Sequence, residues 1–445
     1  MNRIIQFAAV LIILVLLYPV GPLRAIGLQE ILRLAVKNDA RLQAETFSAS
    51  AYGADGWSEI AGYGPALTVT GAITRSRDSS APIHIPKTWE GKKPEERSVN
   101  FLEPALHIGF EQPLVDLQKA YNLKKGKAAI RAADLKKRKA LEDLRLRIHQ
   151  YYYTILSDRE KLNLARQESA ALLQQVRTIR EKLKLGSSII TDQYDAESRY
   201  ELSRAAEIDR ENNLADSRRA LEESINTLLS EPLDDLEAEA RLPVPPDKLE
   251  YWRLFGQKNN TDILLRQFET AMAEASLHAA RGRFLPSLVF FADYNERHPE
   301  GGLSGYGEER IEADVGLRLK MELLSGGRDS AALAATGARM RAAEKNLIAA
   351  RRGFDRSLDS LWRGLETKRK LIATYKSAVR SSEHSLESTR AAYDQGGKVL
   401  LDVLNSQRDY FRTLMRYRSS RYEYMILYEK FKVLTGAGNQ FPSIP

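Results

Sequence analysis

A proline-free stretch, residues 119–185, constrains the fold of this chain more than any other feature. Nearly all of its apolar residues are separated by three, four or seven positions, a period of about 3.5 that is typical of a coiled-coil seam. They are Leu141, Leu144, Ile148, Tyr151, Ile155, Leu162, Ala165, Leu172, Val176, Ile179 and Leu183. As one helix, the stretch would be about 100 Å long. A compact domain has no core that deep, so the helix belongs to an elongated assembly or crosses a space between two places.

The same order of elements is predicted twice along the chain: helix, strand, polar loop, strand, long helix and returning helix. In the first half these are residues 40–62, 67–74, 76–104, 106–114, 119–185 and 189–229. In the second half they are 262–283, 288–294, 298–307, 315–323, 328–395 and 399–434. Such a repeat indicates an internal structural duplication. We therefore divide the chain into a signal peptide (1–25), a first repeat (26–246), a second repeat (247–436) and a C-terminal tail (437–445).

The first residues indicate export. Arg3 precedes an apolar run, residues 4–18, and Ala25 offers a small residue for cleavage, which together predict a secretory signal peptide. An uncleaved membrane anchor is the alternative, but the run is short for a membrane-spanning helix. The chain has no cysteine, which excludes disulfides, thiolate metal sites and thiol nucleophiles and fits a bacterial envelope protein.

No sequence pattern supports an enzyme, a cofactor or a metal site. The six histidines are scattered and none forms a metal-ligand pair at helical spacing. The glycine pairs Gly301-Gly302 and Gly326-Gly327 do not match nucleotide-binding fingerprints. The basic segment 119–147 would suit nucleic acid, but the signal peptide argues against that partner. A solvated helix face is the alternative that we favour, and we expect no nucleic acid.

The predicted strands imply a membrane barrel built from several chains. Each alternates apolar and polar residues, which suits lipid on one face and water on the other, and each is close to the length that spans a bilayer. Four strands cannot close a barrel, and open sheet edges cannot exist in lipid. Three chains would supply twelve strands and twelve parallel tracks of helix. A soluble sheet packed on a helix is the alternative, and it leaves the long helices unexplained.

Four segments, in their order and spacing, carry a family resemblance. They are Leu28-Gln29-Glu30-Ile31-Leu32-Arg33-Leu34-Ala35, Phe284-Leu285-Pro286-Ser287-Leu288, Leu323-Leu324-Ser325-Gly326-Gly327-Arg328 and Gly396-Gly397-Lys398-Val399-Leu400-Leu401-Asp402-Val403-Leu404. Together they resemble the TolC family of outer-membrane efflux proteins over essentially the whole mature chain. The resemblance implies a homotrimer with a twelve-stranded outer-membrane barrel, continued by a long periplasmic α-helical coiled-coil barrel. It also implies a periplasmic adaptor protein and an inner-membrane pump as partners, as in tripartite efflux or type I secretion systems.

The breaks at Gly186-Ser187 and Gly396-Gly397 mark the predicted periplasmic tip turns, where a partner would be met. Asp192 and Asp402 lie equally far beyond these breaks. In a trimer each would form a ring of three carboxylates, and charged rings control what enters a pore. The alternative is that both aspartates are simply favoured in the first turn of a helix by its dipole.

The resemblance adds two expectations for the tips. It implies an acidic constriction at Asp402, weakened because Asn405 stands where the family can carry a second acid. It also implies a closing latch between neighbouring coiled coils at Asp192, Tyr393 and Lys398. Lysine stands there where arginine can occur, and its pairing is less directional, so we expect a looser latch.

From the sequence we conclude that the chain is an outer-membrane channel for export, with a large periplasmic helical region. It would carry substrates from the periplasm or from a pump complex to the outside and open at its tip when a partner engages. The alternative is a non-conducting periplasmic coiled-coil adaptor or structural envelope protein. Drugs, metal ions, small metabolites and polypeptides would all use a similar tunnel.

Overall fold

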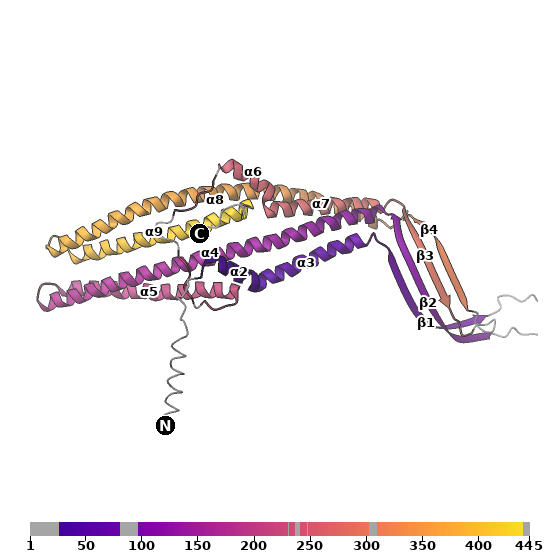
Figure 1. Cartoon of the computed structure of the whole chain (residues 1–445), viewed down its shortest axis with the longest axis horizontal. Coiled ribbons are helices and arrows are strands. Elements are labelled where there is room, and N and C mark those ends of the chain that lie inside the picture. The colour runs from indigo at the N-terminus through magenta and orange to yellow at the C-terminus, as the bar shows by residue number, and fades with distance from the viewer. Residues whose placement is uncertain are drawn as a thin grey trace, which may run out of the picture. The chain divides into compact units, whose positions relative to one another are not determined.

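The structure is a computed structural model that describes residues 26–80, 97–229, 231–235, 241–246, 248–301 and 309–438. The predicted signal peptide and all but the start of the predicted C-terminal tail lie outside these residues. In chain order the elements are α2 (Leu28–Asn38), α3 (Ala40–Ala61), β1 (Ala66–Ser80), β2 (Arg97–Val115), α4 (Leu117–Lys184), α5 (Ile190–Ile225), α6 (Leu249–Asn259), α7 (Thr261–Gly282), β3 (Ser287–Arg297), β4 (Arg310–Lys320), α8 (Arg328–Asp394) and α9 (Leu400–Thr435) (Figure 1). None of the helices in this part of the chain is both long and apolar enough to cross a membrane.

The two long helices predicted from the sequence are confirmed. α4 has 68 residues and α8 has 67, because neither contains a proline and each keeps a regular apolar seam. The returning helices α5 and α9 have 36 residues each. The predicted end of the first returning helix at Leu229 is wrong. Asn226 adopts a left-handed conformation with φ 48° and caps the helix by donating its N–H to the carbonyls of Glu222 and Glu223.

The internal duplication is confirmed by equivalent contacts in the two halves. Asp39 follows α2 and accepts a hydrogen bond from the N–H of Leu42 at 2.6 Å. Asn260 follows α6 and accepts one from the N–H of Ile263 at 2.9 Å. Each side chain therefore caps the next helix, α3 or α7, in the same way. The helix α6 itself was not predicted, and these caps identify it as the counterpart of α2.

The four strands form one antiparallel sheet in the order β1-β2-β3-β4 (Figure 1). The β1–β2 pairing runs from Ala66 opposite Glu111 to Ser80 opposite Arg97. The predicted polar loop, 76–104, is therefore wrong at both ends. Main-chain pairing between two strands does not require an apolar face, so the ribbon continues through polar residues.

The last strand also differs from its predicted range, 315–323. β4 begins at Arg310, where Ile311 already starts the alternation of apolar and polar residues, and it ends at Lys320. Leu323 belongs to the connection that leads to α8. Met321 and Leu323 continue the alternation of apolar and polar residues past Lys320, so this pattern does not by itself show where the strand ends.

Residue contacts divide the chain into two compact units. Of the described residues, those within Met1–Phe47, Lys136–Leu264 and Ala350–Pro445 form the helical unit, which contains both helix-hairpin turns. The sheet unit comprises Ser48–Leu135 and Leu265–Ala349. In the sheet unit, α3 and α4 approach closely, because a Cβ atom on Gly56 would lie only 2.9 Å from the carbonyl oxygen of Gly126.

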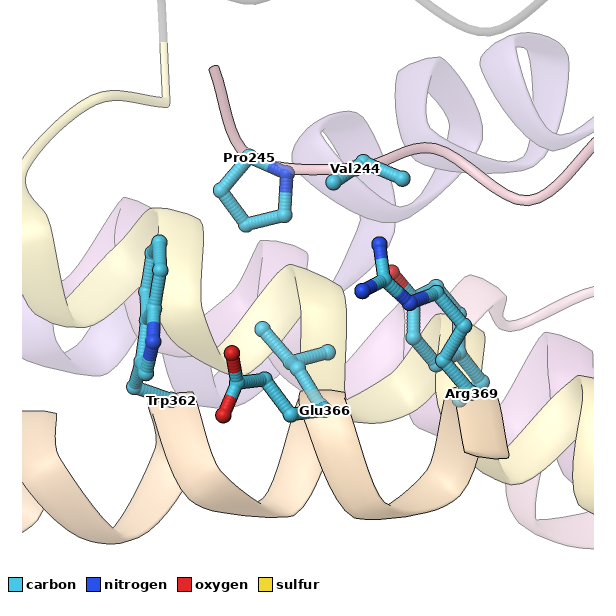
Figure 2. Close-up of a pocket in the computed structure, with 7 residues that line it drawn as sticks. Val244, Pro245, Trp362, Glu366 and Arg369 are labelled. Carbon is cyan, nitrogen blue, oxygen red and sulfur yellow. The ribbon is translucent and has the colours of Figure 1, made fainter. Parts of the chain in front are cut away.

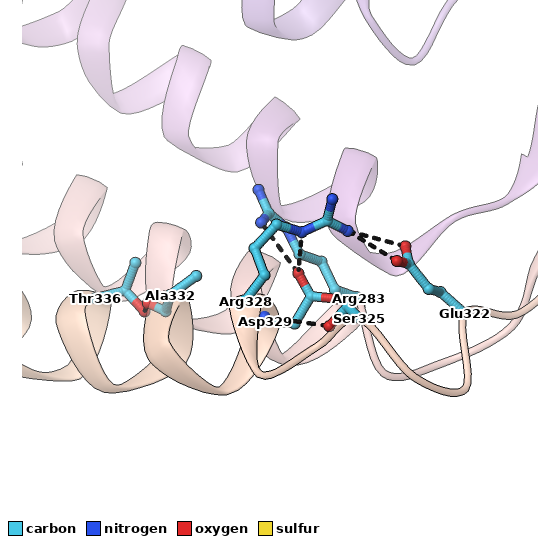
Figure 3. A network of polar contacts seen from close by, with 7 residues as sticks. All are labelled: Arg283, Glu322, Ser325, Arg328, Asp329, Ala332 and Thr336. Carbon is cyan, nitrogen blue, oxygen red and sulfur yellow. Dashed lines mark hydrogen bonds and ion pairs between the residues drawn. The ribbon is translucent and has the colours of Figure 1, made fainter.

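A polar network holds the connection between β4 and α8 in the sheet unit (Figure 3). Arg328 donates to the carboxylate of Glu322 at 2.9 Å, and the N–H of Asp329 donates to Ser325 Oγ at 3.3 Å. Arg283, just after α7, donates to Asp329 at 3.5 Å. Hydrogen bonding with Ser325 and the charge of Arg328 hold the pKa of the Asp329 carboxyl below its ordinary value. The network therefore fixes the start of the long helix against α7.

Candidate functional site

The two helix-hairpin turns have the same backbone geometry. Gly186 has φ 71° and Gly396 has φ 79°, in the left-handed region that glycine favours. The N–H groups of Ser187 and Gly397 each donate at 2.8 Å to a carbonyl in the last turn of the preceding long helix. These bonds satisfy carbonyls that the helix end would leave unpaired. Both turns lie where the sequence predicted the breaks.

The predicted aspartates lie in the first turns of the returning helices, but their partners differ. Ser188 donates its hydroxyl to Asp192 Oδ2 at 3.0 Å. In the second hairpin the corresponding partner is a cation, with Lys398 Nζ 3.6 Å from Asp402 Oδ2. One carboxylate is therefore held by a neutral hydroxyl and the other by a charge that salt screens.

The ends of the two long helices meet through Lys182. Its Nζ lies 4.7 Å from the ring centroid of Tyr393 and 3.9 Å from Asp394 Oδ1. Burial, then the negative charges of Asp192 and Asp394, raise the pKa of the Tyr393 phenol above its ordinary value of 10.0. The stability that the neutral phenol contributes is therefore present below pH 10 and is lost as the pH rises through the raised pKa.

An apolar cluster lies beneath the turns and joins the two hairpins. Its members come from α4, α5 and α9, and they are Leu172, Val176, Ile179, Ala196, Leu400 and Leu404, with Tyr200 and Tyr393 packed against them. Arg199 of α5 donates to Asn405 Oδ1 of α9 at 3.3 Å. The returning helices are thus joined both by apolar packing and by a polar contact.

The five residues predicted to form the constriction and latch lie in one region of the helical unit. Asp192 is close enough to Tyr393 for its charge to affect the phenol. Lys398 pairs with Asp402 on its own side of the turn, and Asn405 contacts the opposite returning helix. Within one chain, the three predicted latch residues therefore fall into two separate groups of contacts. Asp192 lies near Tyr393, whereas Lys398 pairs with Asp402.

Three residues that make contacts in this region were not predicted from the sequence. Lys182 and Asp394 lie at the ends of the two long helices and meet only because the two hairpins pack together. Arg199 lies far from Asn405 in the sequence, and no local pattern predicts their contact.

The sheet separates apolar from polar side chains. By strand register, one face carries Leu67, Val69, Ile73, Leu106, Ile108, Phe110, Leu288, Phe290, Val315, Leu317 and Leu319. On the other face, Arg318 donates to Glu111 at 3.1 Å, and His107 contacts Asn295 at 2.8 Å. An exposed apolar face opposite a polar one is what a strand between lipid and a water-filled lumen requires.

Part of the basic segment 119–147 is ion-paired to other helices. In the sheet unit, Lys125 Nζ lies 2.6 Å from Glu59. In the helical unit, Arg147 lies 2.6 Å from Asp39. The sequence-based expectation of a solvated face is therefore too simple, because these charges join α4 to neighbouring helices.

A small pocket of about 160 Å³ lies in the helical unit, away from the turns in sequence. Figure 2 shows Val244 and Pro245 above Trp362, Glu366 and Arg369 of α8. The segment over the pocket is tied down because its carbonyls accept hydrogen bonds from side chains of α6 and α9. The pocket is the space left beneath this packed segment, and we assign no ligand to it.

Comparison with known proteins agrees with this arrangement. The chain is 24% identical to the outer membrane protein TolC of Vibrio cholerae over 89% of this chain and 85% of that protein. It is also 24% identical to the proteases secretion protein PrtF of Dickeya chrysanthemi, over 97% and 93% of the two chains. The solved CmeC outer membrane channel of Campylobacter jejuni superposes with a TM-score of 0.77 at 15% identity, covering 92% of this chain and 86% of that one.

These comparisons confirm the predicted fold class and outer-membrane localisation, and they favour an export channel over a non-conducting adaptor. The matched family and the curated relatives are efflux and secretion proteins, that is, transport proteins rather than enzymes. The model of the outer membrane efflux protein family matches residues 31–227 and 257–437. The chain therefore belongs to the outer membrane efflux protein family and is an export channel of the outer membrane.

Proposed function

We propose that three copies of this chain form the channel, that its resting constriction is built from the helix-hairpin tips, and that a partner opens it there. The observation that carries the assembly is the sheet. In the described part of the chain its order gives β1 and β4 only one neighbouring strand each. Lipid leaves no water to satisfy an open strand edge, so β1 of one copy pairs with β4 of the next until the barrel closes.

The tips support the location of the gate. Asp192 and Asp402 stand in the first turns of α5 and α9, and three copies multiply each into a ring of carboxylates. Such a ring favours cations and repels anions at the narrowest point. Tyr393 and Lys398 complete the closing contacts, and Asn405 leaves the constriction with one acidic ring on α9 rather than two.

The tips also support contact with a partner. The turn residues Leu185, Ile189 and Val399 are exposed. Leu185 and Ile189 flank the same turn, and a contiguous exposed apolar patch is typical of a surface that another protein covers. We assign them to a periplasmic adaptor together with an inner-membrane pump. Engagement would draw the returning helices apart and separate Arg199 of α5 from Asn405 of α9.

In this proposal the pump, rather than the channel wall, selects the cargo. The Dickeya chrysanthemi relative, named for protease secretion, supports polypeptides among the possible cargoes. The apolar face of the sheet supports direct contact with outer-membrane lipid. The channel is passive in this proposal and carries out no chemistry on what it exports.

Single-channel recording in a planar bilayer tests the gate. Asp402→Ala removes the carboxylate ring and the contact with Lys398, so we expect a larger resting conductance and a weaker preference for cations. Asp209→Ala, an exposed substitution further along α5, serves as the matched control and should leave both unchanged. Unchanged conductance and selectivity in Asp402→Ala would remove Asp402 from the gate.

A further inference from the structure

A cluster of two carboxylates and an imidazole lies at the end of the β3–β4 hairpin, in the sheet unit. Glu296 is the penultimate residue of β3, and Glu309 immediately precedes β4. His298 lies between them: its Nε2 is 2.7 Å from Glu296 Oε1 and 3.8 Å from Glu309 Oε1. The three ligand atoms all lie within 4.8 Å of one another. We propose that Glu296, His298 and Glu309 bind a divalent transition-metal ion of the zinc class.

The donor set fits that ion. Zinc takes imidazole nitrogen and carboxylate oxygen at about 2.0–2.2 Å and accepts three protein ligands with a further position open to water. A single imidazole nitrogen can donate only one proton, so it cannot form good hydrogen bonds to both carboxylates at once. A divalent ion in place of that proton would bind all three groups and offset both negative charges.

The backbone holds these ligands in place. The N–H of His298 donates to the carbonyl of Pro104 on β2 at 2.9 Å. Tyr294 donates its hydroxyl to Glu296 Oε2 at 3.1 Å, which leaves Oε1 facing His298. A hydrogen bond to the second oxygen orients a carboxylate ligand, as outer contacts commonly do in metal sites.

The site belongs to the outer, apolar face of the sheet. Glu296 lies between Leu106 and Ile311 in the register of the three strands. The flanking arginines Arg297 and Arg310 are paired with each other in that register and alternate to the opposite face. A bound ion would therefore join the two ends of the hairpin loop on the side away from the channel lumen. This site could not be predicted from the sequence, because Glu309 is brought to His298 only by strand pairing.

Calorimetric titration of zinc chloride into the mature chain, without a histidine tag and assembled in detergent, tests the proposal at neutral pH. We expect one zinc ion per chain, and a loss in affinity of about tenfold or more in His298→Ala and in Glu309→Gln. Millimolar magnesium should leave zinc binding in place, because imidazole favours zinc over magnesium.

His384→Ala is the matched control. His384 is also exposed and lies 3.3 Å from a single carboxylate, Glu387. This variant should bind zinc as the unmodified chain does. Zinc binding that survives both His298→Ala and Glu309→Gln, or that is absent from the unmodified chain, would overturn the assignment. Conductance is a separate readout, so failure here leaves the gate proposal standing.

Discussion

The two helix-hairpin tips share a backbone but not an environment. Both turns have a left-handed glycine and the same pair of main-chain hydrogen bonds. At equivalent positions beyond the turns, however, Leu404 of α9 is 2% exposed, whereas Tyr194 of α5 is 63% exposed. Duplication has therefore preserved the turn while the side chains around it diverged.

This difference assigns separate tasks to the hairpins. The second hairpin inserts Leu400 and Leu404 into the apolar cluster formed with α4 and α5. The first hairpin leaves Ile190 and Tyr194 uncovered in the single chain. We infer that the second hairpin is held mainly by contacts within the chain and that the first is available to a neighbouring copy or a partner.

The largest expected effect comes from the cluster that joins the hairpins. Leu404→Ala removes a buried side chain, and large-to-small substitutions of this kind cost about 2–5 kcal/mol. We expect that loss to appear as easier local opening of α9 next to the turn, because local stability there depends on this packing. Native-state hydrogen exchange of the assembled channel measures it residue by residue.

Tyr194→Ala is the matched variant in the first hairpin. If Tyr194 stays exposed in the assembled channel, its loss should change local opening by no more than about 0.5 kcal/mol. An equal loss in the two variants would show that a neighbouring copy covers Tyr194, so that the difference in burial holds only within the single chain.

The long helices could be predicted from the sequence because a 3.5-residue period and the absence of proline act locally and persist over many turns. The turn glycines could be predicted because a glycine that interrupts such a helix is also a local signal. The pairing of Lys182 with Tyr393 and of Arg199 with Asn405 could not, because these residues meet only after two hairpins pack together. The strand ends were also missed, since polar residues there continue the main-chain ladder without an apolar pattern.

Substitution of the glycine in each turn should lower local stability by the same amount, and by less than the loss of Leu404. Gly186→Ala and Gly396→Ala each place a Cβ on a left-handed residue with open space around it, so each should cost about 1–2 kcal/mol of local stability. Gly353→Ala, inside α8 and also in open space, should instead stabilise by about 0.5–1 kcal/mol. Hydrogen exchange around each site provides the comparison. Clearly unequal costs at Gly186 and Gly396 would mean that the shared backbone does not govern the turns.

The smallest effect should come from exchanging the partners of the two aspartates. Lys398→Ser gives the second tip the hydroxyl of the first, and Ser188→Lys does the reverse. An exposed ion pair contributes only about 0.2–1 kcal/mol and is screened by salt. In Lys398→Ser, hydrogen exchange at the α8–α9 turn should therefore quicken slightly at low salt and match the unmodified chain at high salt. Ser188→Lys should instead introduce a salt dependence at the α4–α5 turn. If the salt dependence of the second turn persists without Lys398, it arises from another charge, and Lys182 beside Asp394 is the pair to test next.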